Sequence, residues 1–270
     1  MKLNRKICSL ILNLAVMIKY KTQKRFPQQK RILECFFSGF LNKKINLNWN
    51  EILFFQEGFC VRQAAISGLL AEYDPDDYIP AEIAAEVKCI GYGFWNGVCR
   101  AIGLNKFLKN SGTRINCYHN MIDGQSFAQT LLGDEVKNKK KILNMPSKSH
   151  GQIYKCIGAG RALAWLDPDE EVYDISSCPS FDSLLAGKVL AYCFTRVHNP
   201  SELINKINSL KNIYKEQVEI IEFAYLVAFN VVAMVSKNKK DYLINKYNIP
   251  ENLNEYSYKS LCNKLLSTGM

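Results

Sequence analysis

The sequence predicts an all-α fold. Apolar residues recur with the helical period along most of the chain, and no apolar run alternates with period two for more than a few residues. Aspartate-proline pairs close two of the predicted helices, at Asp74-Pro75 and at Asp167-Pro168, because proline cannot continue a helix. With 270 residues, 48% of them hydrophobic, the chain can bury a full core.

A repeated motif predicts an internal duplication. The hexamer Lys88-Cys89-Ile90-Gly91-Tyr92-Gly93 reappears as Lys155-Cys156-Ile157-Gly158-Ala159-Gly160. An acidic residue followed by glycine stands at nearly the same distance before each copy, as Glu57-Gly58 and as Asp123-Gly124. The repeat length is typical of helix-pair units. We therefore expect an internally duplicated helical array, with units at residues 57–104 and 123–170 and kinked helices at the glycine pairs.

The elements expected in the second half follow from apolar periodicity and from caps. Ser201 is the expected cap of a long helix that reaches Val235. The other helices are expected at Gln125–Leu132, Gln152–Leu166, Phe181–Arg196, Asp241–Tyr247 and Leu253–Leu266.

The chain is expected to form three regions, of which the first is marked by its positive charge. The net charge of the whole chain is +10, and nine of its lysines and arginines precede the first acid, Glu34, so most of the excess positive charge lies at the N-terminus. Residues 1–25 are expected to form a basic and apolar helix, residues 26–196 the duplicated core, and residues 197–270 a set of helices packed on that core.

The N-terminal apolar run, residues 7–18, is too short to span a bilayer. A docking helix of the fold is the favoured interpretation. A helix that lies on an anionic membrane surface through residues 1–31 is the second. A signal peptide is the third, although no small-x-small cleavage site follows the run. We expect a cytoplasmic protein, with association at a membrane surface left open.

The paired glycines need a physical reason, because two glycines inside a helix lower its stability. Close approach of a neighbouring helix is the favoured explanation, and a ligand surface flanked by Trp95 and Trp165 is the alternative. A phosphate-binding loop is disfavoured, since no predicted strand precedes either Gly-x-Gly and the third glycine is missing.

The cysteines and histidines carry little evidence of chemistry. The ten cysteines include no Cys-x-x-Cys pair, so we expect buried reduced thiols. The three histidines are scattered, and we expect neither a metal site nor a cofactor. Runs of lysine at 137–141 and 237–240 look like solvated loops, and no nucleic-acid partner is expected.

An enzymatic alternative depends on Cys60. A thiol at a helix N-terminus has a lowered pKa, and His119, oriented by Asp123, could activate it. His119 is expected in a polar loop, and Asp123 has a competing role as a helix cap. Glu57, in the position equivalent to Asp123, either caps its own helix or meets Asp123 across the duplication. No catalytic residue is assigned, and the balance favours a protein that is not an enzyme.

An ordered series of motifs over residues 26–196 resembles the enediyne-biosynthesis-associated proteins of the family called domain of unknown function 1702. The series comprises Glu57-Gly58 with Ala64 and Ala65, Gly91-x-Gly93, Asp123-Gly124 before an aromatic residue, Gly158-x-Gly160-Arg161 leading to Trp165, and Gly187 leading to Ala191-Tyr192. In place of a family motif similar to Asp-Gly-Tyr-Gly-Phe-His, this chain has Asp123-Gly124-Gln125-Ser126-Phe127-Ala128, which lacks the histidine. The resemblance implies an association with polyketide synthases that make highly unsaturated chains, and it implies no catalytic residues.

The expected function is therefore an accessory binding or scaffold protein that holds an apolar, polyketide-like molecule or a partner protein. A cysteine-dependent hydrolase or acyltransferase using Cys60 and a membrane-surface or host-directed interaction protein are the alternatives. The expected ligand-binding residues are Glu57, Gly58, Gly91, Gly93, Trp95, Asp123, Gly124, Gly158, Gly160, Arg161 and Trp165.

Overall fold

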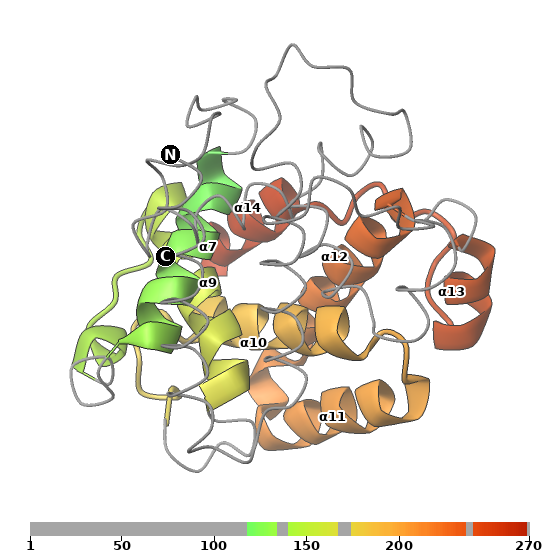
Figure 1. Cartoon of the computed structure of the whole chain (residues 1–270), viewed down its shortest axis with the longest axis horizontal. Helices are drawn as coiled ribbons and strands as arrows, with labels where there is room; N and C mark the ends of the chain where they lie inside the picture. The colour runs from blue at the N-terminus through green and yellow to red at the C-terminus, as the bar shows by residue number, and fades with distance from the viewer. Residues whose placement is uncertain (1–117, 134–139, 167–173, 236–239, 269–270) are drawn as a thin grey trace, which may run out of the picture.

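A computed structural model describes residues 118–133, 140–166, 174–235 and 240–268 (Figure 1). All regular structure within these ranges is helical, which confirms the all-α prediction. The elements are α7 (Tyr118–Leu132), α9 (His150–Leu166), α10 (Phe181–Arg196), α11 (Pro200–Ile213), the 3-10 turn η3 (Lys215–Gln217), α12 (Val218–Val235), α13 (Lys240–Tyr247) and α14 (Tyr258–Thr268).

Several predictions concern residues outside these ranges. The N-terminal helix at 1–25, the first repeat unit at 57–104 and the segment at 26–56 all lie outside the described residues. The superposition of two repeat units therefore stays a prediction.

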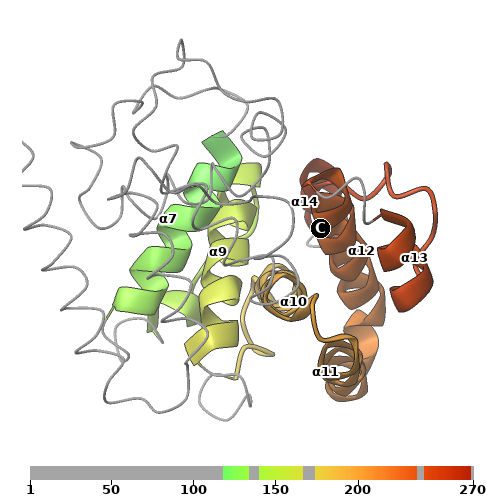
Figure 2. The same ribbon diagram turned by 45° about the vertical axis from the view of Figure 1, so that its right-hand side comes forward.

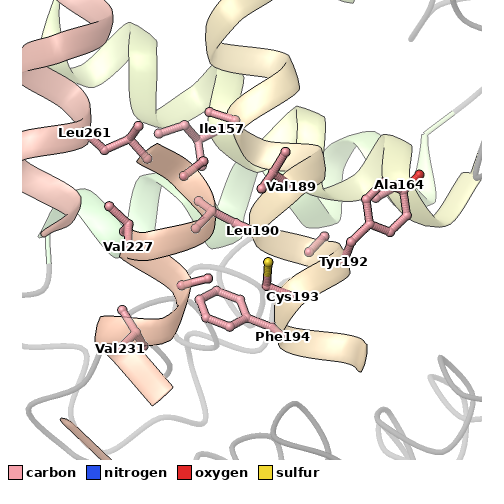
Figure 3. Close-up of a cluster of buried hydrophobic side chains, with 14 of the residues drawn as sticks. Ile157, Ala164, Val189, Leu190, Tyr192, Cys193, Phe194, Val227, Val231 and Leu261 are labelled. Atoms are coloured by element: carbon pink, nitrogen blue, oxygen red, sulfur yellow. The ribbon is translucent and has the colours of Figure 1, made fainter. Parts of the chain in front are cut away.

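The described helices pack in a continuous series. Helix α7 lies beside α9, α9 packs on α10, and α10 packs on α12 (Figure 2). Apolar side chains from four helices meet in the core, where Ile157 of α9, Leu190 of α10, Val227 of α12 and Leu261 of α14 are all fully buried (Figure 3). Helices α9 and α10 therefore form the centre of the described fold.

Glycines let α9 approach both of its neighbours closely. A Cβ atom added at Gly158 would lie less than 3 Å from the carbonyl oxygen of Asp123 in α7, and one added at Gly160 equally near that of Leu184 in α10. Gly187 of α10 meets the carbonyl of Ile157 in the same way. The helix-crossing interpretation is therefore confirmed for the glycine pair of α9, which is helical throughout.

One predicted helix has both of its expected limits, and another has its expected end, although it begins at His150 and not at Gln152. Helix α10 spans Phe181–Arg196 as predicted, and α9 ends at Leu166, directly before the Asp167-Pro168 pair. Local signals also explain where α9 begins, because the Ser149 hydroxyl accepts a hydrogen bond from the backbone N–H of Gln152 (3.4 Å).

The predicted helix from Ser201 to Val235 is wrong in two respects. It begins at Pro200, because the Asn199 side chain accepts a hydrogen bond from the backbone N–H of Glu202 and acts as the cap. It also breaks at Tyr214, whose φ of −110° and ψ of 67° are not helical. A straight helix of that length would run about 50 Å. The break lets both α11 and α12 pack against α10 instead.

The predicted start of the last helix at Leu253 is also wrong, since α14 begins at Tyr258. Ser257 and Ser260 form a reciprocal cap, in which each backbone N–H donates to the other hydroxyl (2.7 and 3.0 Å). This pair resembles a capping box with serine in the third position, and it sets the first turn of α14.

Within the described part of the chain, the segment Lys215–Met234 is long and apolar enough to cross a membrane by length and composition. In this fold, 56% of an 18-residue apolar stretch within the segment is buried, because α12 packs on α10 and α14. A buried core helix passes the same test of length and composition, so the segment does not by itself indicate a membrane protein.

Candidate functional site

A buried ion pair joins α7 to α9. The Arg161 guanidinium donates from Nη1 to Oδ2 of Asp123 at 2.7 Å. The Asp123 side chain is fully buried, and that of Arg161 is 9% exposed. Gly158, one turn before Arg161, contacts the Asp123 backbone, so the close helix crossing and the ion pair occupy the same place.

Tyr258 of α14 completes this group. Its hydroxyl donates to Oδ2 of Asp123 at 3.3 Å and accepts from Nη1 of Arg161 at 3.4 Å. The Tyr154 ring stacks nearly parallel to the Tyr258 ring, with centroids 6.2 Å apart. The guanidinium of Arg161 also lies over the Phe194 ring at 5.3 Å. We call Asp123, Tyr154, Arg161, Phe194 and Tyr258 the ion-pair cluster.

Burial dominates the electrostatics of the ion-pair cluster. It raises the pKa of the Asp123 carboxyl, whereas the charge of Arg161 and the hydrogen bonds from Arg161 and Tyr258 act in the opposite direction. Burial, and then the charge of Asp123, raise the pKa of Tyr258 well above its ordinary value. The Tyr258 hydroxyl therefore keeps its proton and remains a donor. Among the described residues, Oδ1 of Asp123 finds no hydrogen-bond partner, which is an exception among buried carboxylates.

The structure brings together three of the residues predicted for ligand binding: Asp123, Gly158 and Arg161. Gly160 lies on another face of α9, where it packs against α10. The Trp165 ring packs edge-on against Phe127 of α7, with centroids 4.8 Å apart. Gly124 is also buried in α7. The other predicted residues, Glu57, Gly58, Gly91, Gly93 and Trp95, lie outside the described residues.

Two predictions about the candidate catalytic residues are wrong. Asp123 is not a helix cap, because α7 begins at Tyr118 and not at Gln125 as predicted, so Asp123 lies inside the helix. His119 belongs to the first turn of the same helix and not to a loop. Cys60, the proposed nucleophile, lies outside the described residues. Oδ2 of Asp123 is engaged by Arg161 and Tyr258.

Sequence reasoning missed Tyr154 and Tyr258. Tyr258 is 135 positions from Asp123, and no local pattern links the two residues. The serine cap at 257–260 was a usable signal, because it places Tyr258 in the first turn of a helix. Lys188, fully buried in the middle of α10, was also not singled out.

The described cysteines are buried and free, as predicted: Cys156, Cys178, Cys193 and Cys262. Burial raises the pKa of Cys156 and of Cys262 to about 11, and it raises that of Cys193 further. Across residues 118–133, 140–166, 174–235 and 240–268, no group of three or more histidine, cysteine or acidic side chains could hold a metal ion.

We expect these four thiols to be inert in the native protein. At pH 8 a thiol with a pKa of about 11 is on the order of 0.1% thiolate, the form that reacts with iodoacetamide. Mass spectrometry of peptides should therefore find Cys156 and Cys262 modified only after unfolding. Rapid native modification of either residue would contradict the buried geometry. Selective modification of Cys60 with loss of function would instead support the enzymatic alternative.

Comparison with known proteins adds no relative, since no protein-family model, curated protein or solved structure matches this chain.

Proposed function

We propose that the protein is an accessory binding or scaffold component that resembles the enediyne-associated family and acts in the cytoplasm without a cofactor. The observation that carries this proposal is the use the fold makes of the family-like motifs. Four of these residues lie at contacts between helices: Gly158, Gly160, Arg161 and Gly187. These residues position helices and do not present reactive groups to a substrate.

The proposed ligand is an apolar, polyketide-like molecule. A scaffold role would also allow a partner protein to bind instead. The resemblance supports an apolar ligand, because the enediyne-associated family is found together with synthases that make highly unsaturated chains. Helix backbone fills the space beside Gly158 and Gly160. These two glycines would therefore shape such a site by drawing α7, α9 and α10 together, and neighbouring side chains would contact the ligand.

The geometry favours this function over the cysteine-dependent alternative. In the cysteine-dependent alternative, Asp123 was the residue expected to orient the histidine that activates the thiol. The Asp123 carboxylate is fully buried and shared between Arg161 and Tyr258, so its described role is to bind helices together. The membrane-surface alternative depends on residues 1–31, and nothing in the described residues favours it.

A fluorescent polyene tests the proposed ligand class. Titration of the full chain with cis-parinaric acid, a conjugated tetraene fatty acid, is expected to give a saturable rise in fluorescence. It should also stabilise the fold by about 2.7 kcal/mol when the free ligand is at 100 times its Kd. Stearic acid, which has a saturated chain of the same length, is the control for general fatty-acid binding.

The two probes separate the outcomes. Tighter binding of the polyene than of stearic acid supports a site for unsaturated chains. Equal binding of both indicates a general apolar site, and the absence of saturable binding contradicts the apolar-ligand proposal. A polyketide synthase gene beside the gene for this chain would provide independent support.

A further inference from the structure

Helix α14 is attached to the fold by a narrow apolar stripe. Its buried residues are Tyr258, Leu261, Cys262 and Leu265, whereas Lys259, Asn263 and Ser267 are exposed. By contrast, α9 is buried almost continuously from Ile153 to Trp165. Elements with few buried apolar contacts are the ones that open locally without global unfolding.

One buried polar contact adds to this stripe. Within the described residues, the buried hydrogen bonds between α14 and other helices all involve the Tyr258 hydroxyl, with Asp123 and Arg161. The remaining polar links of α14 lie at the surface: His150 with Asn263 (3.1 Å) and Lys264 with Glu219. Surface pairs contribute little to stability. The Tyr258 hydroxyl is therefore the main polar anchor of α14.

Docking of α14 also has an electrostatic cost. It helps to keep water from Asp123 and Arg161, and burial of an ion pair carries a desolvation penalty that the pairing only partly offsets. With α14 docked, Oδ1 of Asp123 lacks a hydrogen-bond partner within the part of the chain that the structure describes, and it would gain one from water. Movement of α14 away from α9 would relieve this penalty.

We propose that α14 is a latch that opens as a unit, and that the hydrogen bond from Tyr258 to Asp123 holds it closed. In the open state, the ring face of Tyr154 and the Asp123–Arg161 pair lose the cover that Tyr258 provides. The latch stands on the geometry of the described helices alone and does not depend on the ligand proposed above.

Hydrogen exchange measured by mass spectrometry tests the latch through Tyr258→Phe, which removes one hydroxyl and keeps the ring. The variant is expected to exchange the α14 amides at least tenfold faster than the wild type, because the lost bond has a charged acceptor. Amides of α9 and α10 that exchange only on global unfolding should gain no more than those of α14, and in both proteins they should stay better protected than the α14 amides. Tyr247→Phe is the matched control, since it removes a buried hydroxyl that donates to the Val197 carbonyl, away from α14.

Two results would overturn the latch. The first is equal protection of the α14 and α9 amides in the wild type without urea, which would show that α14 opens only with the whole fold. The second comes from the wild type in low concentrations of urea. Opening of α14 alone exposes little surface, so its exchange should depend less on urea than that of α9. Equal dependence in the two helices would show that no separate opening exists.

Discussion

Replacement of Arg161 by methionine is expected to lower the free energy of unfolding by about 3–5 kcal/mol. The loss is large because Asp123 is fully buried and, of its donors in the described residues, would keep only the Tyr258 hydroxyl. Methionine retains much of the apolar volume of the arginine stem, so the change tests the charge more than the packing. Urea unfolding followed by circular dichroism measures it.

A double-mutant cycle separates the ion pair from other effects of the substitution. Arg161→Met combined with Asp123→Asn should cost less than the sum of the two single variants, because the second change removes the charge that the first leaves unpaired. Lys211→Met is the matched control. It breaks the exposed pair with Glu222 (2.8 Å) and should cost less than about 1 kcal/mol. Additive losses at Asp123 and Arg161 would show that the two residues do not act as a pair.

Substitution of Gly160 by alanine is expected to destabilise the protein by about 3 kcal/mol, the upper end of the usual range for overpacking. The added methyl group would lie less than 3 Å from the Leu184 carbonyl, and backbone cannot move aside as the end of a side chain can. Gly187→Ala, at the same crossing of α9 and α10, should behave alike because it meets the Ile157 carbonyl. Thermal and urea unfolding measure both changes.

Gly151 provides the control for these variants within the same helix. Apart from its two chain neighbours and the nearby backbone of α9 itself, no atom of the described residues lies within 4 Å of the position that a Cβ atom would take there. Gly151→Ala should therefore leave stability unchanged or raise it by up to about 1 kcal/mol, through the better helix propensity of alanine. If Gly160→Ala were as stable as Gly151→Ala, the close crossing of α9 and α10 would be refuted.

Local signals explain the parts of the fold that the sequence predicts well. Helix α10 was predicted with both of its ends, and the end of α9 follows from the Asp167-Pro168 pair. The close crossing at Gly158 and Gly160 was also foreseeable, since two glycines in one buried helix need a compensating contact. Each of these inferences uses residues within a few positions of one another.

Less of the candidate site could be predicted. Asp123 and Arg161 were both named as site residues, but their pairing was not inferred, and Tyr258 was not named. An aspartate beside glycine is a common helix cap, so sequence alone favoured that role for Asp123. The role changes because α9 supplies a buried guanidinium to the middle of α7, a contact between residues that are 38 positions apart.

The sequence by itself determined that this protein is helical. It also determined the end of α9 through proline and the limits of α10 through apolar periodicity, and it placed glycines where helices cross closely. Only the tertiary structure decided that Tyr214 separates α11 from α12, that Asp123 lies inside a helix, and that Tyr258 joins it to Arg161. The physical reason is the range of the interactions. Caps, prolines and periodicity act within a few residues, whereas burial and ion pairing depend on which helices the whole chain brings into contact.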